Sequence, residues 1–291
     1  MSNARKLADN LPSVGQLSGR NVAINGAMNV SQRATSATGL GGGSGYYTVD
    51  RYKTQTVGTT AGRYTMEQAG ISDLPGFHNC IKLSCTTADT SIGGSESLLF
   101  RQIIEGQDLQ RFAKGTSDAK EFTVSFYVKG NANATYTCEL FDSDNSRQIS
   151  KTFSVTTSWT RVILTFPADT TGAFTDDNGV SLYVTIWLVA GPNYSSGTLN
   201  SSAWASQTTA NRASGSQTNF FDSTSRTLFV TGLQLESGPQ ATPFEYEPVG
   251  VTLEKCKKYF QKIKGPVHAM PMWSYGGTTA STNFKISPEM R

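Results

Sequence analysis

Four aromatic side chains stand among hydroxyl and charged residues in segments with the alternating pattern of β-strands: Tyr127, Phe141, Tyr183 and Trp187. Each lies at a position opposite the apolar residues of its segment, so we expect it to face away from a core. Aromatic rings can stack on the C–H surfaces of sugars while nearby hydroxyl groups hydrogen-bond the sugar hydroxyls. These four residues are therefore the candidate glycan-binding residues. Packing under loops, or against another subunit, is the alternative.

Acidic side chains in two predicted turns are the candidate metal ligands: Asp142, Asp144, Asp176 and Asp177. Carboxylate oxygens are ligands that Ca²⁺ prefers. Aspartate is equally common in turns that bind no ion, and the spacing is not that of an EF-hand. A structural Ca²⁺ is thus one alternative, and no other cofactor is expected.

Residues with the spacing of a catalytic site are not evident. His78 and His268 stand apart from any nucleophile motif, and the chain has no G-x-S-x-G, H-E-x-x-H or P-loop sequence. The four cysteines lack metal-type spacing, which favours reduced, buried thiols. We therefore predict that the chain is not an enzyme. A pair of carboxylates for glycoside cleavage stays open, although nothing nominates one.

Composition narrows the class of protein further. The 291 residues carry a formal net charge of +3 and only 16% charged residues, which argues against a nucleic-acid surface with clustered basic residues. The longest apolar run, Leu182–Val189, is far shorter than the roughly 18 residues of a membrane-spanning helix. No apolar signal core follows Met1, so we expect synthesis in a cytosol without export by that route.

Short segments of alternating apolar and polar residues, separated by turn residues, run through most of the chain. They are Glu121–Gly130, Thr135–Phe141, Trp159–Phe166, Ser181–Gly191 and Thr227–Glu236. Many such strands without long helices between them predict an all-β chain, folded as an antiparallel β-sandwich of the jelly-roll type.

We predict that the chain has three parts: an N-terminal arm (1–20), the β-sandwich (21–248) and a C-terminal module (249–291) made of one helix and short strands. Within them we predict two short strands around a turn in Asn21–Val30, a flexible loop in Thr35–Tyr46 and a helix over Val251–Lys264, capped by Thr252. The segments Trp273–Tyr275 and Asn283–Ile286 are expected to be β.

Three segments resemble bacteriophage tail-fibre and related virion proteins with a jelly roll like that of carbohydrate-binding modules. The opening Asn21–Arg33 is similar to their N-x-x-I-N-G-x-x-x-x-x-Q-R motif. Glu105–Leu109 followed by Phe122–Lys129 resembles the middle of that jelly roll. The closing part resembles its last strand and following helix, in Val230–Gly238, Pro243–Glu247 and Leu253–Phe260.

This resemblance implies a non-enzymatic structural protein of the virion, assembled in the host cytoplasm, most often a homotrimeric tail fibre or fibre-like adhesin. Its partners would be other phage virion proteins and a host surface polysaccharide, with no nucleic acid and no membrane insertion. The arm would attach it to the particle through Lys6, Leu7 and Leu11. The alternatives are a capsid decoration protein without a ligand and a glycan depolymerase, although the repeat period of a β-helix enzyme is absent.

Overall fold

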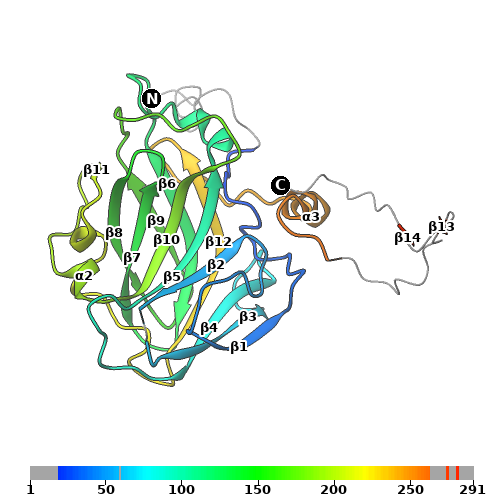
Figure 1. Ribbon diagram of the computed structural model, residues 1–291, viewed down its shortest axis with the longest axis vertical. Coiled ribbons are helices and arrows are strands. Elements are labelled where there is room, and N and C mark those ends of the chain that lie inside the picture. Colours follow the sequence, from blue (N-terminus) through cyan, green and yellow to red (C-terminus); the bar gives the residue numbers. More distant parts are fainter. Residues whose placement is uncertain (1–18, 59, 263–272, 275–279, 282–291) are drawn as a thin grey trace, which may run out of the picture.

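The computed structural model describes residues 19–58, 60–262, 273–274 and 280–281. Two antiparallel β-sheets face each other and form a sandwich (Figure 1). Sheet A has the order β1-β3-β4-β12-β6-β9 and sheet B the order β11-β8-β7-β10-β5-β2, each with 6 strands. The strands of sheet A are β1 (Ser36–Leu40), β3 (Arg63–Gly70), β4 (Asn79–Thr87), β12 (Thr227–Ser237), β6 (Phe122–Gly130) and β9 (Thr160–Phe166). Those of sheet B are β11 (Ala205–Ser206), β8 (Arg147–Val155), β7 (Ala134–Asp142), β10 (Val180–Ala190), β5 (Ser97–Glu105) and β2 (Tyr52–Val57). The predicted antiparallel jelly-roll sandwich is confirmed.

Helices are few and short in the described part of the chain. The α-helices are α2 (Pro192–Ser195) and α3 (Val249–Lys257), and the 3-10 helices are η1 (Gly106–Asp108), η2 (Gln110–Phe112) and η3 (Thr209–Asn211). None of these helices has the length and apolar character needed to cross a membrane. The pair β13 (Trp273–Ser274) and β14 (Ala280–Ser281) is antiparallel. The predicted strand at 283–286 lies outside the described residues, and the division into three parts stays a prediction.

The core lies between the sheets and follows the alternation of the sequence. On β6 the apolar residues Phe122, Val124 and Phe126 are fully buried and point inward. Phe122 stacks on Phe112, with 4.1 Å between ring centroids, and Phe126 meets Phe153 edge to face. Burial of such large apolar side chains is the main favourable term for this fold.

The N-terminal part of the sandwich differs from the prediction in two places. The segment 21–30 forms the predicted turn but not the two predicted strands, because the side chain of Asn25 makes the local hydrogen bonds. Its amide donates to the Val30 and Asp50 carbonyls and its oxygen accepts from the Val30 N–H. The predicted loop 35–46 contains strand β1, which pairs with β3. A strand of exposed Ser, Thr and Gly residues at a sheet edge carries no apolar alternation by which to recognise it.

The C-terminal helix is also shorter than predicted. Helix α3 begins at Val249 and ends at Lys257, and Thr252 lies inside it with its hydroxyl donating to the Glu247 carboxylate. Thr252 is therefore not the cap. Beyond the helix, the Phe260 ring stacks 3.7 Å from the Arg33 guanidinium, and the carbonyl of Phe260 accepts a hydrogen bond from Gln32. These contacts hold the chain in a path that the helix would not follow.

The opening segment 21–33 contacts the closing part of the chain. Asn21 donates to the carbonyl of Leu233 and accepts from the N–H of Leu235, so it fills a gap beside β12. Gln32 donates to the Asp50 carboxylate at 2.5 Å as well as to Phe260. The first and last of the three segments that carry the family resemblance are thus in direct contact.

The four cysteines, Cys80, Cys85, Cys138 and Cys256, are free thiols and buried, as predicted. Burial raises the pKa of Cys80 and of Cys256 to about 12. They are structural residues without the lowered pKa of a reactive thiol.

Candidate functional site

The surface of sheet B that faces away from the core carries most of the candidate residues. Strand register places Arg101 of β5 opposite Thr185 of β10, and Thr185 opposite Glu139 of β7. In the next row Tyr183 lies opposite Phe141. We call this surface the outer face of sheet B; it consists of Arg101, Glu139, Phe141, Gln148, Tyr183, Thr185 and Trp187.

Two aromatic rings form the partly exposed centre of this face. Phe141 and Tyr183 are half-buried, and their ring centroids are 6.0 Å apart. The guanidinium of Arg101 lies 4.9 Å from the Tyr183 ring, and that of Arg212 lies 4.8 Å from the Phe141 ring. The result is an apolar platform between two cations, with hydrogen-bonding groups at its edges.

Trp187 lies on the same face but is covered. Only 1% of its surface is exposed, because the segment that includes α2 and η3 folds over this end of the sheet (Figure 1). Its ring packs 5.2 Å from the Tyr194 ring, and its Nε1 donates to the Glu139 carboxylate at 2.9 Å. The prediction that Trp187 stacks on a ligand is wrong for this structure, since the ring is already enclosed.

Glu139 is fully buried and neutralised. Arg212, at the end of η3, donates to both of its carboxylate oxygens at 2.7 and 2.9 Å. Together with the bond from Trp187, this paired arrangement satisfies the charge that burial would otherwise penalise. Glu139 and Arg212 therefore hold the covering segment on the sheet.

Arg101 is in a different electrostatic position. It is 7% exposed and its Nη1 donates to the Gln55 side chain at 3.1 Å. In the part of the chain that the structure describes, no carboxylate forms an ion pair with it. Burial lowers the pKa of Arg101 to about 10, although the Glu139 charge acts in the opposite direction. A desolvated guanidinium beside an aromatic ring is a binding group for an anion.

Tyr127 is not part of this face. It lies on β6 of sheet A, where its half-buried ring packs 5.2 Å from the Phe77 ring and 5.9 Å from the Arg161 guanidinium. Phe77 also contacts Tyr246, which is 58% exposed. The structure thus brings together three of the four candidate aromatics and places the fourth on the opposite sheet.

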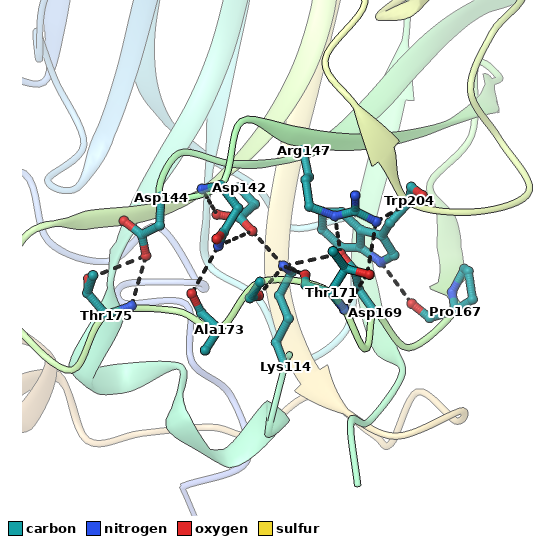
Figure 2. Close-up of polar contacts among 12 residues, drawn as sticks. Lys114, Asp142, Asp144, Arg147, Pro167, Asp169, Thr171, Ala173, Thr175 and Trp204 are labelled. Atoms are coloured by element: carbon teal, nitrogen blue, oxygen red, sulfur yellow. Dashed lines mark hydrogen bonds and ion pairs between the residues drawn. The ribbon is translucent and has the colours of Figure 1, made fainter. Parts of the chain in front are cut away.

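The predicted calcium ligands meet other partners. Figure 2 shows the ammonium of Lys114 among four oxygen atoms: Asp142 at 2.6 Å, Asp169 at 3.1 Å, and the carbonyls of Thr171 and Gly172 at 2.9 and 2.7 Å. The Lys114 side chain is fully buried. It occupies the position at which a cation would contact Asp142.

Asp144 and Asp177 also have protein partners, both in the loop before β10. Asp144 accepts hydrogen bonds from the N–H and hydroxyl of Thr175, and Asp177 accepts from the Gly179 N–H. Among the described residues, no group of three or more His, Cys, Asp or Glu is placed to hold a metal ion. The set Asp142, Asp144, Asp176 and Asp177 is therefore not assembled as a calcium site. The attachment candidates Lys6, Leu7 and Leu11 lie outside the described residues.

Sequence reasoning missed Lys114, Arg101 and Arg212. Arg101 carried a usable signal, because a single charged residue interrupts the apolar run of β5. Lys114 and Arg212 lie in connections without periodicity, so only the folded chain shows what they pair with.

Neither a protein-family model nor a curated protein matches the chain. Among solved structures it is similar to the enzymatically active domain of tailspike protein 4 of bacteriophage CBA120, with a TM-score of 0.36 and 8% identity over 75% of this chain and 21% of that chain. A carbohydrate-binding module of family 4 gives 0.36 and 11% over 73% and 97% of the two chains. A family 61 module in complex with β-1,4-galactotriose gives 0.34 and 10% over 75% and 99%. These are distant likenesses of fold, so function is argued from the site.

Proposed function

We propose that the chain is a non-catalytic protein that binds a glycan on the outer face of sheet B. The observation that carries this proposal is the half-buried pair Phe141 and Tyr183 at the centre of a face otherwise made of hydrogen-bonding groups. A sugar ring presents an apolar C–H surface and a polar rim, which matches this arrangement.

The buried carboxylate of the face supports binding over catalysis. Hydrolysis of a glycosidic bond normally requires two carboxyl groups that can act on the substrate. The Glu139 carboxylate already accepts three hydrogen bonds, from Arg212 and Trp187, and is fully buried. It is thus committed to the fold. Incubation with a bound polysaccharide should release no new reducing ends, and their release would contradict the non-catalytic role.

Binding is tested by comparing aromatic variants on the two sheets. Tyr183→Ala and Phe141→Ala should each weaken binding of a glycan selected on a glycan array by about tenfold, or about 1.4 kcal/mol. Tyr127→Ala is the matched control, because it removes a half-buried tyrosine from sheet A. Titration calorimetry measures all three. Equal losses for Tyr127→Ala and Tyr183→Ala, or no loss for either sheet B variant, would contradict the proposed face.

The second part of the proposal is that the chain is a virion component, a tail fibre or fibre-like adhesin, that forms a homotrimer. It is supported by the resemblance of several segments to phage virion proteins, namely 21–33, 105–109, 122–129, 230–238, 243–247 and 253–260. In this role residues 1–20 attach the protein to the particle. Deletion of residues 1–20 should abolish incorporation into particles while the sandwich still folds. Normal incorporation of the shortened chain would refute the anchoring role.

A further inference from the structure

We infer that the glycan carries a carboxylate, as in a hexuronic acid, and that Arg101 is the residue that binds it. This inference rests on the proposed glycan-binding function and adds the class of sugar. It is carried by the charge, the burial and the unused donors of the outer face of sheet B.

The two arginines beside the aromatic pair are not equivalent. Arg212 is neutralised by two hydrogen bonds to Glu139. Arg101, next to Tyr183, contacts the neutral amide of Gln55, and no ion pair in the described part of the chain includes it. Of the two guanidiniums beside the aromatic pair, the one on the Tyr183 side is therefore the one without an ion pair among the described residues.

Unpartnered polar atoms gather around that charge. Nε of Arg101 is buried and has no hydrogen-bond partner, and neither has the hydroxyl of Thr185, its register neighbour on β10. A buried group of this kind costs about 1–3 kcal/mol when left unsatisfied. Thr185 is 0% and Arg101 7% exposed, so a ligand approaches this pair at the guanidinium of Arg101.

A carboxylate fits these groups better than a neutral hydroxyl. The guanidinium presents a planar set of donors that pairs with the two oxygens of a carboxylate. The pyranose ring of a uronic acid holds its carboxylate at the ring edge, so a sugar stacked on Tyr183 would bring it beside a guanidinium that lies 4.9 Å from the same aromatic ring. A neutral sugar would leave Arg101 without a direct ion pair.

The test uses wild-type protein and matched pairs of oligosaccharides. The acidic probes are oligogalacturonate, oligomannuronate, and fragments of hyaluronan and polysialic acid. Each is compared with its carboxyl-reduced form, and a sulfated galactan fragment serves as an anion without a carboxylate. We expect at least one acidic probe to bind, with affinity reduced about tenfold or more by carboxyl reduction.

Variants then assign the effect to Arg101. Arg101→Gln should weaken the acidic probe at least tenfold and change the carboxyl-reduced form less than twofold. Arg101→Lys, which keeps the charge without the planar donors, should fall between wild type and Arg101→Gln. Lys82→Gln is the control, because Lys82 lies on β4 of sheet A, away from this face, and carries the same charge. If the Arg101 variants fail to fold by circular dichroism, the comparison of acidic and reduced probes on wild-type protein decides.

The outcomes separate this inference from the proposed function. Binding of neutral glycans that depends on Tyr183, with no preference for acidic probes, would overturn the carboxylate inference and leave glycan binding intact. Equal binding of the sulfated galactan would overturn it in the same way. Failure of every acidic and neutral probe to bind would overturn both.

Discussion

Replacement of Lys114 by methionine tests the buried polar network of Figure 2, in which one ammonium serves two carboxylates. Methionine keeps the length of the side chain and removes only the charge and its donors. Asp169 keeps its two hydrogen bonds from Arg147, at 2.7 and 3.0 Å. Asp142 keeps only the backbone and side-chain bonds from Asn145 and becomes a buried charge without a counterion.

The size of the effect follows from that loss. Removal of one partner of a buried ion pair costs about 3–5 kcal/mol, because the other charge stays buried and unpaired. The net stability of a domain is about 5–15 kcal/mol, so the substitution removes a large share of it. The carbonyls of Thr171 and Gly172 also lose a donor. We expect a fall in melting temperature of roughly 10 °C for a domain of this size.

Urea denaturation of wild type, Lys114→Met and the double variant Lys114→Met/Asp142→Asn measures the effect. Asparagine is neutral, so the double variant should recover at least half of the loss. A cost below about 1 kcal/mol, or a double variant no more stable than the single one, would refute the claim that the Lys114 charge neutralises Asp142.

Three other outcomes are expected. The pKa of Asp169 is raised by burial but lowered more by its hydrogen bonds, chiefly those from Arg147, so it lies below its ordinary value. The ionised carboxylate therefore stabilises the fold above about pH 4, and this stabilisation is lost as the pH falls through the native pKa. Asp169→Asn should reduce that loss of stability in acid, measured by urea denaturation at several pH values. Arg33→Ala removes the stacking on Phe260 and should speed amide exchange in α3, measured by mass spectrometry. Gly106→Ala places a Cβ 2.0 Å from the Thr175 carbonyl oxygen and should cost about 1–3 kcal/mol in thermal unfolding.

The strands that the sequence predicted correctly share one physical feature. On β6 and β10 the side chain at every second position packs in the core, so apolar residues recur at every second position of the sequence. β1 is held by hydrogen bonds to β3 and buries little, so its residues Ser36–Leu40 carry no such period. The turn at Asn25 was predicted, but the two strands beside it were not found, because Asn25, with a positive φ of 60°, makes side-chain hydrogen bonds to Val30 and Asp50 that no local pattern shows.

The candidate site could be predicted only in part for the same reason. Alternation places Phe141, Tyr183 and Trp187 on one side of sheet B, and the structure agrees with that placement. Which of them stays exposed depends on the covering segment, whose anchor at Arg212 pairs with a carboxylate far away in the sequence. A pairing between distant residues produces no repeating pattern in either segment, so it cannot be recognised from the sequence.

In the proposed glycan-binding role, charged residues at the edge of the platform would decide the specificity. The aromatic pair Phe141 and Tyr183 offers an apolar surface to any sugar ring, so it selects weakly among sugars. Glu139 neutralises Arg212 on one side, and no described carboxylate does so for Arg101 on the other. A carboxylate introduced at Gln55, whose side chain already contacts Arg101, should satisfy that cation internally and weaken an acidic ligand about tenfold without touching the platform. Gln55→Glu with unchanged affinity would show that the Arg101 charge plays no part in recognition.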